Sequence, residues 1–273
     1  MKWSAIVLSV FATTAFLASS VASAQGLIWS LPEDGTLVRY KGVYKQTSRQ
    51  PNATEGDLEL SWDRILEIRS VGGETASYQG QDTKCRWIEL KVETGHSPEG
   101  VLDAGPGATR MYKLLVPESE IRGSNTVPVA GEKSIFAAFI PIVKGYRRIG
   151  DEPAKPMQAG VFQLYPLISL LRHYPDLETG EQTQTSVLAG DFSTTKYTGD
   201  LVMETNVYRS SNSAEIQQSK DFPFGVVSWI AKTVTEEKGT TDERSEFREV
   251  TVIEEEMKAI GIENNAQSEF LVE

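Results

Sequence analysis

The sequence predicts a mainly β protein, a β-rich α+β fold in which a curved antiparallel sheet forms a half-barrel or a sandwich beside one or two short helices. Three observations predict this fold class. Apolar and polar residues alternate with a period of two in many segments of the 273-residue chain, Gly- and Pro-rich breaks separate these segments, and helical spacing is rare. Hydrophobic residues make up 40% of the chain, which is sufficient for a core.

The first 24 residues have the three-part pattern of a secretory signal peptide. Met1-Lys2 supplies a positive start, residues 6–17 form an apolar stretch, and residues 22–24 are an A-x-A cleavage site. The other interpretation is a membrane anchor, but a membrane span takes about 20 apolar residues and this stretch is shorter. We therefore expect cleavage after Ala24, a secreted or periplasmic protein, and no integral membrane span after cleavage. Residues 25–273 are expected to form a single β-rich domain with an acidic C-terminal segment.

Nine segments of the mature chain have the alternation of half-buried strands. In the first of them, Tyr40 and Tyr44 fall on one side of the strand, while Arg39 and Lys41 fall on the other. The predicted strands are residues 36–45, 57–62, 65–71, 85–93, 109–116, 195–208, 215–219, 224–234 and 247–257. Turn-forming residues predict breaks at 72–73, 95–98, 105–107, 210–213 and 238–242.

Helical signals are few. Residues 161–174 carry apolar residues at helical spacing, with Pro166 suited to the first turn and Pro175 after the last. We expect a helix there that begins near Tyr165, and a second, short helical turn after Pro117.

The chain is acidic, with 38 Asp and Glu residues against 27 Lys and Arg residues and a net charge of −11. This balance argues against nucleic acid as a partner, because nucleic-acid binding needs a dominant basic surface. Residues 236–273 hold twelve acids and four bases, and their densest run is Glu254–Glu256. We expect this run to be the solvated end of a strand or helix, followed by a frayed tail. The basic residues Lys144, Arg147, Arg148 and Lys155 are expected in a solvated loop, with an anionic ligand as the alternative.

The sequence offers one catalytic motif match, the S-x-x-K of Ser193-Thr-Thr-Lys196, which lacks the S-D-N and K-T-G elements that its chemistry needs. The chain has no G-x-S-x-G elbow, no phosphate-binding loop and no dinucleotide fingerprint, and its two histidines, His96 and His173, lack metal-ligand spacing. We expect no cofactor and no metal site. A hydrolase with carboxylates assembled in space stays open, with Glu89 and Glu204 among the available acids.

The single cysteine, Cys85, lies in an alternating segment. We expect a buried free thiol, and an intermolecular disulfide is the alternative.

Two apolar runs, residues 135–143 and 222–230, are the best sequence evidence for a site. Runs without charges are shielded from water on both faces, so they are core strands or the wall of an apolar cavity. Pro141 and Pro223 favour edge or bulge positions. The residues expected to form an apolar ligand-binding wall are Phe136, Phe139, Ile142, Phe222, Phe224 and Trp229.

The signal peptide, the long alternating strands and the apolar strand Phe224-Gly-Val-Val-Ser-Trp229 together resemble the exported half-barrels of the lipoprotein-carrier (Lol-type) family. That resemblance implies a curved antiparallel sheet that wraps helices and shelters acyl chains. Three blocks, residues 86–91, 112–118 and 222–225, resemble segments of uncharacterised exported bacterial proteins and imply no function.

The sequence therefore favours an exported, non-catalytic binding protein for an apolar or amphipathic, lipid-like ligand. The alternatives are a structural or interaction domain of an extracellular or envelope assembly, with an unidentified protein partner, and the hydrolase described above.

Overall fold

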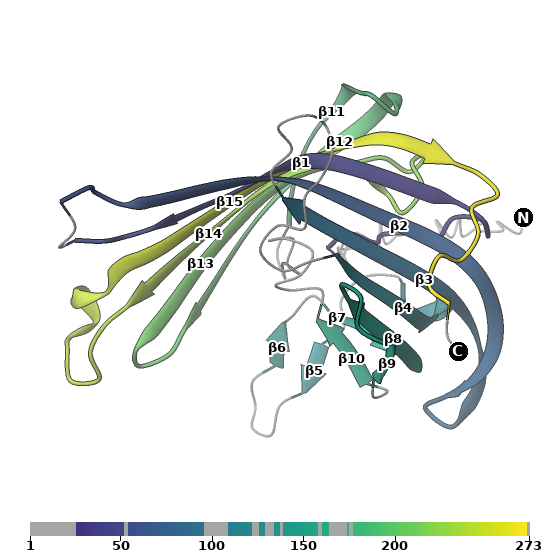
Figure 1. Cartoon of the computed structure of the whole chain (residues 1–273), viewed down its shortest axis with the longest axis horizontal. Coiled ribbons are helices and arrows are strands. Elements are labelled where there is room, and N and C mark those ends of the chain that lie inside the picture. The colour runs from purple at the N-terminus through teal and green to yellow at the C-terminus, as the bar shows by residue number, and fades with distance from the viewer. Residues whose placement is uncertain are drawn as a thin grey trace, which may run out of the picture.

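One large, curved, open antiparallel sheet dominates the computed structural model (Figure 1). Two small two-stranded sheets lie on its concave side. The structure describes residues 26–51, 54–95, 109–121, 126–128, 134–136, 139–157, 160–163, 174 and 177–271. This architecture confirms the predicted mainly β class and the curved antiparallel sheet.

The strands vary from three residues to twenty-one. They are β1 Leu37–Ser48, β2 Leu58–Tyr78, β3 Gln81–Gly95, β4 Arg110–Pro117, β5 Thr126–Pro128, β6 Ser134–Phe136, β7 Phe139–Ile142, β8 Lys144–Ile149, β9 Lys155–Met157, β10 Gly160–Gln163, β11 Leu177–Val187, β12 Gly190–Glu204, β13 Tyr208–Gln218, β14 Val226–Glu237 and β15 Arg248–Glu263. Two 3₁₀ turns, Glu118–Glu120 and Arg244–Glu246, are the helical elements of the described residues.

The large sheet has the strand order β11-β12-β13-β14-β15-β1-β2-β3-β4-β8-β9. The sheet consists of two runs of strands, β11 to β15 on one side and β1-β2-β3-β4-β8-β9 on the other. The two runs join where the first strand of the chain, β1, pairs with the last, β15. This β1–β15 ladder extends from Leu37↔Glu263 to Ser48↔Thr251, with a register shift between Arg39 and Tyr40. Residues more than 200 positions apart in the sequence are therefore neighbours at the middle of the sheet.

Most predicted strands are confirmed, but two predicted breaks are wrong. Residues 57–62 and 65–71 belong to one long strand, β2, and the expected turn at Gly72-Gly73 is a register shift within the β2–β3 ladder. The expected turn at Ser210–Ser213 lies inside β13. Small polar residues continue the strand there because neighbouring residues form hydrogen bonds with their side chains.

Residues 161–163, where the helical spacing begins, form part of β10, which pairs with β7. The helix expected from about Tyr165 falls on residues 164–173, which lie outside the described part of the chain, so it stays a prediction. The short turn expected after Pro117 is confirmed as the first 3₁₀ turn. The solvated-loop prediction for the basic cluster is also wrong: Lys144, Arg147 and Arg148 are in β8, and Lys155 is in β9.

The two faces of the large sheet differ in chemistry. Alternate residues on the concave, inner face are apolar and form the core. On the outer face, cross-strand ion pairs connect neighbouring strands, among them Arg39–Glu67, Lys41–Asp63 and Lys232–Glu254. The Glu254–Glu256 run follows this alternation. The side chains of Glu254 and Glu256 are half-exposed and form ion pairs, whereas the side chain of Glu255 points inward and is buried. The expectation that this whole run is solvated is therefore wrong.

The C-terminal segment is held on the outer face instead of being frayed. The buried carboxylate of Glu89 accepts hydrogen bonds from the Ser268 hydroxyl and the Glu269 backbone N–H, the latter at 2.9 Å, and pairs with Lys113 at 3.2 Å. Phe270 is fully buried. Residues 268–270 therefore form a strap across the outer face, named the C-terminal strap below.

The β1–β15 ladder has a position that only glycine fits. A Cβ atom on Gly42 would lie 1.8 Å from the backbone oxygen of Glu256. We predict that Gly42→Ala lowers the free energy of unfolding by about 1–3 kcal/mol, because the strands must separate to admit a methyl group. The control is Gly261→Ala in β15, where an added Cβ would have no heavy atom within 4 Å. Urea unfolding measures both variants, and equal stabilities would contradict the close approach.

The C-terminal strap also predicts a pH dependence. Burial alone would raise the pKa values of Glu67 and Glu269. The hydrogen bonds from Arg69 and Arg39 to Glu67, and from Lys91 to Glu269, outweigh burial and hold both pKa values below the ordinary range. These acids therefore stabilise the fold fully above the unfolded value of about 4.3, and this stability is lost as the pH falls through the lower native values.

We expect Glu269→Gln to lower stability at pH 7 and to flatten the loss of stability on acidification. Urea unfolding between pH 7 and pH 3 measures this, with Glu254→Gln as a control for the change in charge. An acid slope equal to that of the wild type would show that the strap does not have this role.

Candidate functional site

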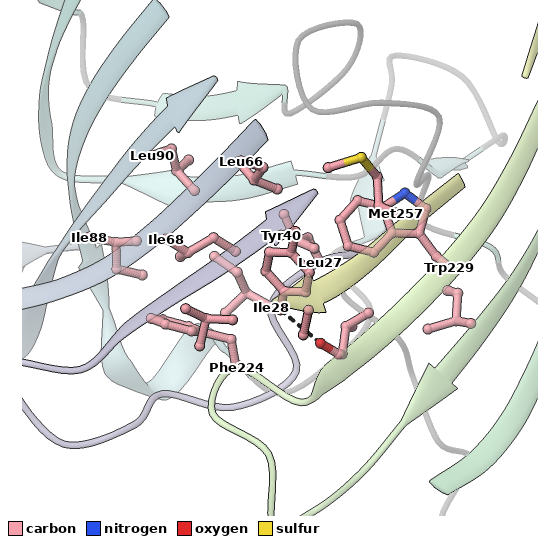
Figure 2. Packing of buried hydrophobic residues seen from close by; sticks show 14 of the residues in the cluster. Leu27, Ile28, Tyr40, Leu66, Ile68, Ile88, Leu90, Phe224, Trp229 and Met257 are labelled. Carbon is pink, nitrogen blue, oxygen red and sulfur yellow. Dashed lines mark hydrogen bonds between the residues drawn. The ribbon is translucent and has the colours of Figure 1, made fainter. Parts of the chain in front are cut away.

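The inner face carries a continuous apolar layer drawn from both runs of strands (Figure 2). Leu66 and Ile68 of β2 lie beside Ile88 and Leu90 of β3, and Met257 of β15 lies beside Trp229 of β14. All six side chains are at most 1% exposed. The period-two alternation of apolar and polar residues in the sequence produces this layer, because every second residue of each strand faces inward.

Two short segments without strand structure cover part of this layer. Leu27 and Ile28, directly after the expected cleavage site, are buried in the core. Phe222 and Phe224, in the turn before β14, are buried there too, and Phe224 has a φ of +61°, which is unusual for a residue with a side chain. The Trp29 backbone N–H donates to the Phe224 carbonyl at 2.8 Å, which ties the two segments together.

Tyr40 connects these segments to the centre of the sheet. Its hydroxyl donates to the Val226 carbonyl at 2.7 Å, and its ring lies 5.1 Å from the Trp229 ring and 6.4 Å from the Phe222 ring. Complete burial raises the pKa of Tyr40 well above its ordinary value, so the phenol stays neutral and serves as a donor.

A buried ion pair borders the apolar layer. Arg64 of β2 and Glu255 of β15 lie 2.7 Å apart, with side chains 10% and 1% exposed. The Trp229 indole N–H donates to Glu255 at 3.2 Å, and Arg64 donates to the Thr94 hydroxyl at 3.1 Å. The guanidinium carbon also lies 4.2 Å from the centre of the Tyr44 ring. The inner face is therefore amphipathic, with a paired charge at the edge of an apolar surface.

Beyond the ion pair, buried polar residues continue along the inner face on β13 and β14. Thr233 of β14 donates to the Asn212 side-chain oxygen at 2.7 Å, and Asn212 donates to the carbonyls of Leu201 and Ser210, each at 3.1 Å. These bonds explain why the serine-rich segment of β13 remains a buried strand, because its polar groups have partners.

The structure brings four of the six predicted wall residues into one apolar cluster. Ile142, Phe222, Phe224 and Trp229 are each at most 3% exposed and belong to the same core. The other two, Phe136 and Phe139, lie in β6 and β7, and their side chains are outside the described part of the structure. The apolar run at 222–230 is a core strand only from Val226 onward, since Pro223 lies in the preceding turn. Whether the four clustered residues contact a ligand stays a prediction.

Sequence reasoning missed the Arg64–Glu255 pair and the covering residues Leu27 and Ile28. Glu255 shares its alternation with Ile253 and Met257, and this was the available signal that it faces inward. Arg64 fell between two strands that were predicted separately. Leu27 and Ile28 belong to no predicted strand, so no pattern could assign them to a face of the sheet.

Candidate catalytic groups are not gathered in the described residues. Glu89 lies in β3 under the C-terminal strap, whereas Glu204 lies at the end of β12 and pairs with Arg244 at 2.7 Å. Five strands separate β12 from β3 in the sheet, so these two acids do not form a pair. The described residues contain no group of three or more His, Cys, Asp or Glu residues placed to hold a metal ion. His96 and His173 lie outside the described ranges.

Cys85 is a free thiol that is 1% exposed, which confirms the predicted buried cysteine. Burial raises its pKa, and the charges of Glu74 and Glu118 act in the same direction. A thiol of this kind is a weak nucleophile.

Comparisons with known proteins add no family. No family model matches the chain, and no curated protein matches it. Two crystal structures match at low similarity. One, from Parabacteroides distasonis ATCC 8503, is provisionally described as a lipoprotein; it has 10% identity and a TM-score of 0.31 over 87% of this chain and 99% of the other.

The second, from Bacteroides fragilis NCTC 9343, is provisionally described as an exported protein with a YmcC-like fold. It has 9% identity and a TM-score of 0.34 over 87% of this chain and 100% of the other. At these TM-scores the likeness supports no argument about function. Among the described residues, no helix has the length and hydropathy needed to cross a membrane.

The buried ion pair predicts a large effect on stability. We expect Arg64→Met to lower the free energy of unfolding by about 3–5 kcal/mol, because Glu255 then keeps a buried charge without its guanidinium partner. The double variant Arg64→Met with Glu255→Leu should recover part of this loss. Chemical denaturation measures both.

The matched control is Lys232→Met, which removes the same charge from the half-exposed Lys232–Glu254 pair and should cost at most about 1 kcal/mol. Equal losses for Arg64→Met and Lys232→Met would mean that burial of the inner pair has no energetic importance.

Proposed function

We propose that this protein is an exported, non-catalytic binding protein whose curved sheet shelters an apolar or amphipathic, lipid-like ligand on its inner face. Export rests on the signal-peptide pattern of residues 1–24 and cleavage after Ala24. The absence of a complete catalytic motif from the sequence motivates the non-catalytic part.

The observation that carries the proposal is the amphipathic inner face of an open sheet. Its apolar layer suits a hydrocarbon chain, and the Arg64–Glu255 pair at the border suits a polar end group. The turn that carries Phe222 and Phe224 covers this layer without being a strand of the sheet. A bound chain would take the place of these phenyl rings, so the turn would move when ligand enters.

Trp229 provides a direct probe of this ligand position. We predict that a brominated fatty acid, which quenches tryptophan emission at short range, quenches the wild-type protein. Trp229→Phe should lose a measurable part of this quenching, because Trp29, which is tied to Phe224, also emits near the apolar layer. Trp87→Phe, which changes a tryptophan on the outer face, should keep it. Equal quenching in the two variants, or none in the wild type, would refute an inner-face site.

A second candidate, an interaction domain, has one specific observation in its favour. The strand β11 is largely exposed and pairs only with β12 among the described residues, so its outer edge offers free backbone hydrogen-bonding groups. Size-exclusion chromatography with light scattering across salt concentrations tests it. A concentration-dependent oligomer that Thr183→Pro abolishes would favour this candidate, and a monomer under all conditions would count against it.

A further inference from the structure

On the outer face, most cations of the described residues have a carboxylate partner. Strand β8 is different: Lys144 and Arg148 form no ion pair within the described structure, while Arg147 is opposite Tyr112 and points to the other face of the sheet. Lys144 and Arg148 are therefore a local excess of positive charge on the outer face of a strongly acidic protein.

Arg148 is the β8 cation with the clearest unused capacity. Its guanidinium donates one hydrogen bond, to the Met111 sulfur at 2.8 Å, and its carbon lies 5.3 Å from the centre of the Phe270 ring. A thioether is a weak acceptor, and a guanidinium has five N–H donors in a planar fork. Among the residues that the structure describes, most of the donors of Arg148 therefore have no acceptor.

These donors border a cleft of about 960 Å³ between the C-terminal strap and the β8–β9 hairpin. Tyr146 and Met111 line it beside Arg148, and the apolar residues Pro153, Pro156 and Leu271 line its walls. Leu271 is 73% exposed and places an apolar side chain at the cleft wall. The volume and the mixed lining suit a small organic molecule.

The acids of this cleft are mostly engaged. Glu93 and Glu269 both pair with Lys91, at 3.5 and 2.8 Å, and Glu152 pairs with Lys155 at 2.6 Å. Asp151 lies in the exposed turn of the β8–β9 hairpin. The cleft therefore presents three paired carboxylates, the exposed carboxylate of Asp151 in the turn, and the guanidinium of Arg148, which has no ion-pair partner among the described residues.

From this arrangement we propose a second binding site, separate from the inner face, in which the cleft beside Arg148 binds an organic oxyanion. The ligand carries a carboxylate or a phosphate, which the guanidinium fork receives through paired hydrogen bonds. It also carries an apolar or ring-shaped body, which packs against Tyr146, Met111 and the proline wall. This site does not depend on the proposed function of the inner face.

The test is a titration of the full mature chain followed by NMR and calorimetry. Phenyl phosphate and benzoate are the probes with both features, inorganic phosphate lacks the body, and benzyl alcohol lacks the charge. We expect both complete probes to bind and to shift the amide signals of Tyr146, Gly150 and Ala154. Their ratio identifies which oxyanion the fork prefers. Binding of benzyl alcohol or of inorganic phosphate as tight as that of phenyl phosphate would overturn the proposal.

Arg148→Gln should weaken binding of the preferred probe at least about tenfold, the loss expected for charge-assisted hydrogen bonds. Lys144→Gln removes the same charge from the same strand outside the cleft and should change affinity by less than about threefold. Arg148→Lys keeps the charge without the fork and should fall between the two. Equal affinities for the Gln variants, or amide shifts confined to other regions of the wild-type protein, would overturn the site.

Discussion

The pairing of β1 with β15 is the constraint on which the rest of the structure depends. It joins two runs of antiparallel strands into one sheet, and it requires the close backbone approach at Gly42. The same ladder places Tyr40 opposite Ala259, where its ring meets that of Trp229, and it brings β2 close enough to β15 for Arg64 to reach Glu255. The apolar layer and its charged border both exist because the ends of the chain meet at the middle of the sheet.

The strict alternation of each strand then separates two kinds of surface. The inner face holds the core and a buried ion pair, whose desolvation is tolerable only with close partners. The outer face holds half-exposed pairs such as Lys232–Glu254 that contribute little individually, together with the largely buried pairs of Glu67 and the C-terminal strap fixed by Glu89. Glu254–Glu256 illustrates the separation, since three successive acids alternate between solvent and core.

Much of the sheet could be predicted because half-buried strands leave a period-two signal, as in residues 36–45 and around the buried Cys85. Strand β11 left no such signal, since nearly all of its residues are exposed. The segment Ser210–Ser213 looked like a turn because its burial depends on hydrogen bonds from Asn212 to Leu201 and from Thr233 to Asn212, which join residues of three different strands. The Arg64–Glu255 pair was inaccessible for the same reason: it needs the β15–β1–β2 order, which no local pattern contains.

The central claim is that the amphipathic inner face shelters an apolar ligand. Native mass spectrometry of the exported protein purified from its own host tests this claim most directly. The account predicts an added mass that organic solvent removes and that proves to be an apolar or amphipathic molecule. A protein that carries only its own mass, and that yields nothing on extraction, would contradict the claim.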